Sequence, residues 1–144
     1  MRTSPAAMLA GMSYGTESAG AVHAMSQTAG GVYNLPHGVL TAAMLPPVMA
    51  YNYMGEPQKY ARIAQAMGEV TENLSLHEAS EMSVAAVKKL LTAVGISFRL
   101  SDYGIPQKDL PILVEGGLKQ SRLFVPNPRD LTEPDVRKIY EGAF

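Results

Sequence analysis

Two histidines, His23 and His37, are the side chains of this sequence best placed to do chemistry. They stand fourteen positions apart, one within an apolar run and the other directly after a proline. A neutral imidazole binds a divalent metal through one ring nitrogen while a second group holds the other nitrogen. A helix, a turn at Gly30-Gly31 and a returning helix would bring the two rings to one point. The pattern therefore allows half of a metal site.

Two structural histidines near a turn are the other interpretation, and the spacing alone favours it. A catalytic metal normally needs about three protein ligands, and no convincing third ligand is found in the sequence. The carboxylates Glu17, Glu72 and Glu78 are scattered over positions expected on helix surfaces. The third histidine, His77, is expected to lie exposed in a first helical turn, with no function.

The composition excludes several kinds of protein and several kinds of site. With 144 residues, 47% hydrophobic and 17% charged, the chain is long and apolar enough for one globular domain. A net charge of −1 offers no electrostatic case for binding nucleic acid or a membrane surface. The absence of cysteine excludes disulfides, thiolate metal sites and thiol nucleophiles, and is compatible with the cytoplasmic location that we expect. No apolar stretch approaches the roughly 20 residues that span a bilayer.

Helices are predicted to position the two histidines. Ser4 and Pro5 begin a first helix over 5–15, interpreted as buried, and a second helix over 18–31 ends at the diglycine, where a left-handed cap is easy. Residues 32–38 would form a loop. The segment 38–54 is apolar nearly all round, as a central helix would be, and Pro46-Pro47 should kink or end it.

The second half of the chain is also predicted to be helical. A helix over 56–68 is predicted to pack through one face and to stop at Gly68; the face comprises Tyr60, Ile63, Ala64 and Met67. Ser75 and Glu78 form a capping box for a helix that ends at Gly95; its recurring apolar positions are Met82, Ala86, Leu90 and Val94.

Two further helices complete the prediction. The helix over 107–120 is weaker, because Gly116-Gly117 costs about 1 kcal/mol per glycine relative to alanine. Thr132 and Asp135 cap a final helix. About seven helices without a strand pattern predict an all-α, bundle-like domain. No Rossmann fingerprint or P-loop is present.

The segment around the histidines, AGAVHAMSQTAGGVYNLPHGVLTAAMLPPVMAYN (19–52), resembles the C-terminal helical domain of the iron-containing (group III) alcohol dehydrogenases. The family pattern there is a Val-His, a short helical run, two small residues and a Pro-His-Gly. The resemblance continues through 60–68 and 86–105 and ends with the Asn-Pro-Arg and capped helix of 127–144. The resemblance implies the dehydroquinate synthase-like helical fold. It also implies that 1–144 is a single helical metal-binding domain without the nucleotide-binding domain.

The resemblance also implies roles for individual residues. His23 and His37 match two metal-ligand positions, with Fe²⁺ as the usual metal and Zn²⁺ also suited. Tyr14 falls where the family often has an aromatic residue near the nicotinamide. Gln27 replaces a histidine that many members have near the substrate, and it can form hydrogen bonds but cannot relay a proton. Pro47 likewise stands where many members have a histidine.

The function implied by the resemblance is part of a metal-dependent alcohol dehydrogenase. Hydride would pass between a primary alcohol or diol and NAD or NADP in a cleft between two domains. The family's other two ligands, an Asp and a His, belong upstream of Met1, so this chain alone is expected to be inactive. The expected partners are a small alcohol or aldehyde and either a second copy or an N-terminal partner chain. A non-catalytic helical interaction module, or one piece of a split enzyme, is the alternative.

Overall fold

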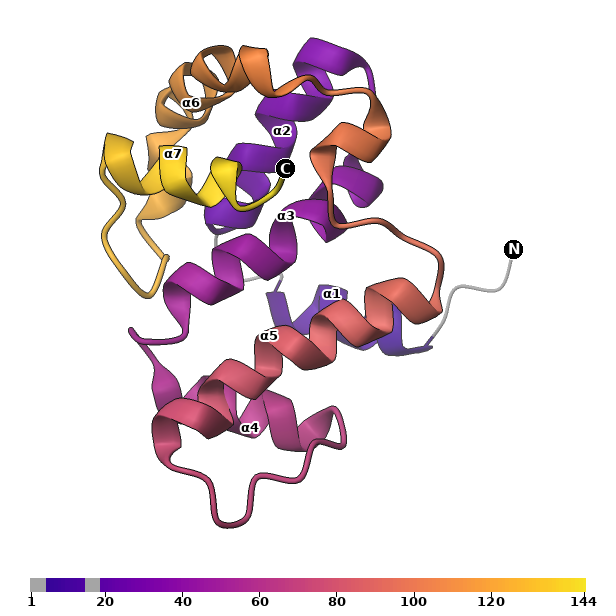
Figure 1. Ribbon diagram of the computed structural model, residues 1–144, viewed down its shortest axis with the longest axis vertical. Coiled ribbons are helices and arrows are strands. Elements are labelled where there is room, and N and C mark those ends of the chain that lie inside the picture. Colours follow the sequence, from indigo (N-terminus) through magenta and orange to yellow (C-terminus); the bar gives the residue numbers. More distant parts are fainter. Residues whose placement is uncertain (1–4, 15–18) are drawn as a thin grey trace.

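The computed structural model describes residues 5–14 and 19–144, and this part of the chain is helical without strands. Seven α-helices and three short 3-10 helices follow one another (Figure 1): α1 (Pro5–Tyr14), α2 (Ala21–Tyr33), α3 (His37–Asn52), α4 (Pro57–Ala66), α5 (Leu76–Ala93), η1 (Leu100–Tyr103), η2 (Gln107–Asp109), α6 (Leu110–Lys119), η3 (Ser121–Phe124) and α7 (Glu133–Glu141). The predicted all-α class is confirmed. None of the helices in the described ranges has the length and hydropathy needed to cross a membrane.

Helix α3 joins two packed groups of helices. On one side α3 packs with α2 and α7, and α6 packs against those two helices; on the other side α3 packs with α5, which in turn packs with α4 (Figure 1). The larger core lies on the first side and includes Met25, Leu40, Leu113 and Tyr140. A smaller core, around Met49, lies toward α5. A helix that contributes to both cores must be apolar nearly all round, as the sequence of α3 is.

The turn between α2 and α3 lies later than predicted. Gly30 and Gly31 are inside α2, and the helix ends at Tyr33 with Asn34 in the left-handed conformation (φ 53°, ψ 41°). Asparagine adopts this conformation readily, because its side chain can form local hydrogen bonds. The predicted diglycine turn is therefore wrong, and the predicted loop shrinks to Asn34–Pro36.

The prolines of α3 do not end it. Pro46 and Pro47 lie inside a helix that continues to Asn52. A proline cannot donate to the preceding turn and costs about 3 kcal/mol in a helix interior. Burial offsets this cost, because Pro46, Val48 and Met49 all lie in the core.

The capping signals of α4, α5 and α7 are confirmed, whereas parts of the predicted buried faces are wrong. Gly68 and Gly95 have positive φ angles of 88° and 73° after α4 and α5. Capping boxes join Ser75 to Glu78 and Thr132 to Asp135. Three residues predicted to pack inward are exposed: Ile63, Leu90 and Val94. The buried stripe of α5 instead runs through Ala79, Ser83, Val87 and Leu91.

Helix α6 forms through both of its glycines. A Cβ atom added at Gly116 would lie 2.3 Å from Thr28 Cγ2 of α2. The missing side chain therefore lets α6 and α2 approach each other closely, which compensates for the lower helix propensity of glycine.

Helix α1 forms over Pro5–Tyr14 of the predicted range 5–15, with Gly15 outside the described residues, but it is not buried. Its large apolar side chains are mostly exposed: Met8 is 56%, Leu9 61% and Met12 70% exposed. No helix of the described chain packs extensively over α1. The prediction of a buried first helix is therefore wrong for this chain, although the sequence is as apolar as a buried helix requires.

Candidate metal centre

The structure brings the rings of His23 and His37 together. Their centroids are 5.5 Å apart and the ring planes are inclined at 47°. Two imidazoles that bind one ion through nitrogens at about 2.1 Å, at an angle near tetrahedral, have centroids roughly 5 Å apart. The observed separation is close to this value, so the two rings are spaced as ligands of one ion would be.

The turn after α2 explains how residues fourteen positions apart meet. His23 lies in the first turn of α2, and His37 is the first residue of α3. Asn34 reverses the chain, and Pro36 is extended (φ −59°, ψ 127°). The connection therefore runs back along α2, where the backbone oxygen of Leu35 lies beside Gly30. An extended residue covers about 3.3 Å against 1.5 Å in a helix, so a few residues suffice for the return.

The hydroxyl groups of Ser26 and Thr41 connect α2 and α3 close to the two histidines. Ser26 Oγ lies 3.2 Å from Thr41 Oγ1 and 3.3 Å from the backbone oxygen of His23, and its single proton is shared between these two acceptors. Thr41 Oγ1 donates to the backbone oxygen of His37 at 2.8 Å and lies 3.4 Å from its Nε2. Ser26 is fully buried. The Ser26–Thr41 pair thus holds the start of α3 against α2 at the level of both imidazoles.

Sequence reasoning missed the Ser26–Thr41 pair, although a signal for it exists. Ser26 follows His23 by three positions and Thr41 follows His37 by four. Residues three and four apart share a helix face. A small hydroxyl residue at that spacing from each histidine marks groups that can support the rings.

The surroundings favour the neutral form of His23. Burial lowers the pKa of its imidazole below the ordinary value, and the nearby His37 lowers it further. The neutral imidazole is the form that binds metal. Protons therefore compete with a metal at His23 less than they would at an isolated histidine.

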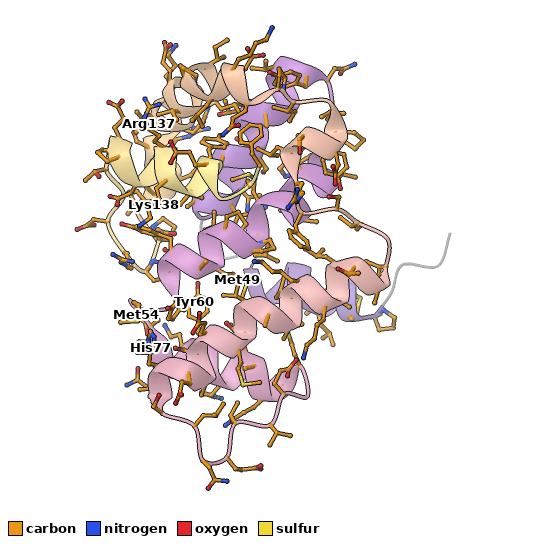
Figure 2. The ribbon with its side chains drawn as sticks, viewed as in Figure 1. Met49, Met54, Tyr60, His77, Arg137 and Lys138 are labelled. Atoms are coloured by element: carbon orange, nitrogen blue, oxygen red, sulfur yellow. The ribbon has the colours of Figure 1, made fainter. Side chains whose placement is uncertain are left out.

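The other predicted positions add no third ligand to this pair among the described residues, and some lie outside the described side chains. Gln27 is exposed on α2, one turn after His23. Tyr14 is the last residue of α1, and its side chain lies outside the described residues, as Glu17 does altogether. His77 is exposed in the first turn of α5, as predicted. Its Nδ1 lies 3.2 Å from the sulfur of Met54, and Figure 2 shows both residues beside the start of α5.

The imidazoles of His23 and His37 are suited to form part of a metal site. Within residues 5–14 and 19–144, no group of three His, Asp or Glu side chains is arranged to hold a metal ion. Imidazole nitrogens suit Fe²⁺ and Zn²⁺, and two of them leave coordination positions for further ligands. His23 and His37 therefore fit such an ion as two of its ligands.

Comparison with known proteins identifies the family. The family model for the C-terminal part of the Fe-containing alcohol dehydrogenases matches residues 2–144. The chain belongs to this family. This Fe-containing alcohol dehydrogenase domain is 40% identical over 139 residues to the 1,3-propanediol dehydrogenase of Citrobacter freundii, with 96% of this chain and 36% of that protein covered. Lactaldehyde reductase of Escherichia coli is 39% identical, with 94% and 35% covered.

The solved structures agree with the fold. A 1,3-propanediol oxidoreductase matches with a TM-score of 0.90 and 40% identity, over 96% of this chain and 36% of that chain. An alcohol dehydrogenase from Oenococcus oeni matches with the same TM-score, identity and coverage. The Fe-containing alcohol dehydrogenase domain thus spans about a third of the length of these relatives.

Proposed function

We propose that this domain is the metal-holding part of an alcohol or diol dehydrogenase, with His23 and His37 as two ligands of Fe²⁺ or Zn²⁺. The observation that carries the proposal is the 5.5 Å separation of the two rings in a chain of this family. The remaining ligands and the NAD or NADP site would come from residues outside these 144.

In this proposal each described residue has a limited task. The bound metal would supply Lewis-acid polarisation of an alcohol, and the nicotinamide would accept the hydride. His23 and His37 hold their rings close together, and burial favours the neutral imidazole at His23. The Ser26–Thr41 pair fixes the backbone of both ligand positions. Gln27, an exposed amide one turn after His23, can orient a polar substrate by hydrogen bonds but cannot exchange protons with it near neutral pH.

Metal titration of the purified chain tests the ligand assignment. Calorimetry with Zn²⁺, or with Fe²⁺ under anaerobic conditions, should give one site per chain. His23→Ala and His37→Ala should each weaken binding about tenfold or more, because losing even a group that supports a ligand costs about 10–100-fold in affinity. His77→Ala is the matched control and should leave the affinity unchanged. Equal affinities for all three variants would contradict the assignment.

Turnover assays test whether the chain acts alone. We expect no NAD- or NADP-dependent oxidation of 1,3-propanediol or short alcohols by the 144 residues, because two ligands and no described nucleotide site are too little. Activity that disappears in His23→Ala would show this expectation to be wrong. Activity that appears only on adding a nucleotide-binding partner chain would support a split enzyme.

The exposed apolar side chains of α1 favour a second candidate, a non-catalytic interaction module. Met8, Leu9 and Met12 form a contiguous turn of exposed apolar surface, and exposed apolar patches often mark interaction sites. In this case the domain would bind a partner chain, and the two histidines would be structural. A chain that binds no metal in the titration but captures a partner would favour this candidate.

A further inference from the structure

We propose a second ligand site in this domain: a cationic cavity between α3, α5 and α7 that binds a small organic anion, with a phosphate or carboxylate head and an apolar body. The cavity has a volume of about 520 Å³, within the range of roughly 300–1,000 Å³ typical of small-molecule sites. It begins at Pro46 and Pro47, which lie about 15 Å along α3 from His37. It is thus separate from the candidate metal centre.

Positive charge is concentrated around this cavity. Four of the chain's twelve lysines and arginines line it: Lys88 of α5, Arg99, Arg129 and Lys138 of α7. The chain as a whole has a net charge of −1, so this concentration is not part of a generally basic surface. The ion pairs found among the described residues involve other lysines and arginines. Lys88, Arg99 and Lys138 therefore have no ion-pair partner among the described residues, whereas Arg129 already contacts Tyr51 and acts on the charge of Asp135.

The one acidic side chain on the wall, Asp135, compensates only part of this charge. Asp135 lines the cavity, but its Oδ2 already accepts the backbone N–H of Thr132 at 2.9 Å and the Thr132 hydroxyl. These hydrogen bonds lower the pKa of the Asp135 carboxyl. Four positive side chains against one negative side chain on the wall leave an excess that attracts an anion.

Arg129 is held in place for recognition of an oxyanion. Its guanidinium carbon lies 4.1 Å from the centroid of the Tyr51 ring, and its Nη1 donates to the backbone oxygen of Tyr51 at 2.6 Å. A guanidinium has five N–H donors in a planar fork that matches phosphate and carboxylate geometry. Because these two contacts restrain the guanidinium, binding loses less side-chain freedom than it would with an arginine that has no such contacts.

The rest of the wall suits an apolar body. Phe98, Phe144 and Pro47 line the cavity and are each partly buried. Lys88 Nζ lies 5.5 Å from the centroid of the Phe98 ring, so a cation and an aromatic face adjoin. Figure 2 shows Lys138 on α7, the helix that packs on α3. The cavity thus offers cations for the head of a ligand and aromatic rings for its body.

Binding of phenyl phosphate to the purified 144-residue chain tests the proposal. Calorimetry should show saturable binding, weaker binding of inorganic phosphate and no binding of phenol. Lys138→Gln and Arg99→Gln, at exposed positions that do not endanger folding, should each weaken binding roughly fivefold, as expected for loss of a partly screened charged contact. Lys108→Gln removes the same charge from an exposed position outside the cavity and should leave affinity unchanged. Higher salt should weaken binding.

The comparison of probes identifies the chemistry of the ligand. Tighter binding of benzoate than of phenyl phosphate would assign a carboxylate head, and the reverse order a phosphate head. In nuclear magnetic resonance spectra, both probes should shift signals of Phe98 and Tyr51 and not those of His23. Equal binding by Lys138→Gln and Lys108→Gln, or binding of phenol as tight as that of phenyl phosphate, would overturn the proposal.

Discussion

Single side chains decide how firmly α2 and α3 are joined at the histidines. The buried Ser26 hydroxyl contacts Thr41 and the backbone of His23, and the buried Tyr140 hydroxyl donates to the backbone oxygen of Met25 at 2.9 Å. Burial raises the pKa of Tyr140, so its hydroxyl stays a donor. A buried polar group left without its partner costs about 1–3 kcal/mol. These contacts therefore restrain α2 from two sides.

Ser26→Ala should weaken metal binding without removing a ligand. The hydroxyl pair holds α3 against α2, and loss of a group that supports a ligand lowers metal affinity about 10–100-fold. Ser80→Ala is the matched control, because Ser80 is equally buried and donates to the backbone oxygen of His77 three positions earlier. Both variants should lose similar stability in urea unfolding, but Ser26→Ala alone should lose Zn²⁺ affinity. Equal Zn²⁺ affinities would assign Ser26 a purely structural role.

Helices in this domain depend on their contacts as much as on their propensity. Gly31 and Gly116 both lie inside helices, in α2 and α6. A Cβ atom at Gly31 would meet nothing within 4 Å, whereas one at Gly116 would lie 2.3 Å from Thr28 Cγ2. The same residue type thus costs stability at one position and permits close packing at the other.

Alanine substitutions at these two glycines should have opposite effects. Gly31→Ala should raise the free energy of unfolding by about 0.5–1 kcal/mol, because alanine is the better helix former. Gly116→Ala should lower it by about 1–2 kcal/mol, because the added methyl group overpacks the contact with Thr28. In a Thr28→Ala background, the loss caused by Gly116→Ala should disappear. Urea unfolding measures all four variants, and stabilisation by Gly116→Ala alone would contradict the close approach.

The capping box of α5 should make stability depend on pH. Hydrogen bonds from the Ser75 hydroxyl and backbone N–H lower the pKa of the Glu78 carboxyl. A carboxylate with a lowered folded-state pKa contributes stability above its unfolded pKa of about 4.3. That contribution is lost as the pH falls through the lower folded-state value.

Glu78→Gln should therefore lower the urea midpoint at pH 7 and lose this effect in acid. The exposed Glu72→Gln is the control, since Glu72 has no side-chain hydrogen bond in the described chain, and it should change the midpoint little at either pH. Urea unfolding at pH 7 and at several values below 4 measures the difference. A deficit of Glu78→Gln that persists unchanged into acid would show that the carboxylate charge is not the source of the stability.

The described molecule exposes apolar side chains on α1 that are not packed into either hydrophobic core. The exposed side chains of α1 lie outside both hydrophobic cores. Large exposed apolar patches promote association. The domain also spans about a third of its relatives' length.

Self-association should depend on α1. Light scattering should show a mass that rises with concentration, and replacement of Met8, Leu9 and Met12 by Gln should reduce this rise. Val125→Gln serves as the control, because Val125 is 85% exposed and lies outside α1, and it should change nothing. A monomer at every concentration in the unsubstituted chain would contradict the expectation.

Patterns local in the sequence predicted local structure well. The all-α class, the capping boxes at Ser75 and Thr132 and the stop at Gly68 depend on neighbouring residues alone, and the structure confirms them. The resemblance of the segment around His23 and His37 likewise indicated the family that the comparisons show.

Contacts between distant residues decided the rest. The length of α2, the continuation of α3 through Pro46 and the burial of Leu91 instead of Leu90 depend on which surfaces meet in three dimensions. The Ser26–Thr41 contact and the separation of the two imidazoles likewise require the return of the chain at Asn34. Helix propensities differ by about 1 kcal/mol per residue or less, except at proline, whereas a buried side chain gains about 1.5–3 kcal/mol. Packing therefore prevails over local preference where the two conflict.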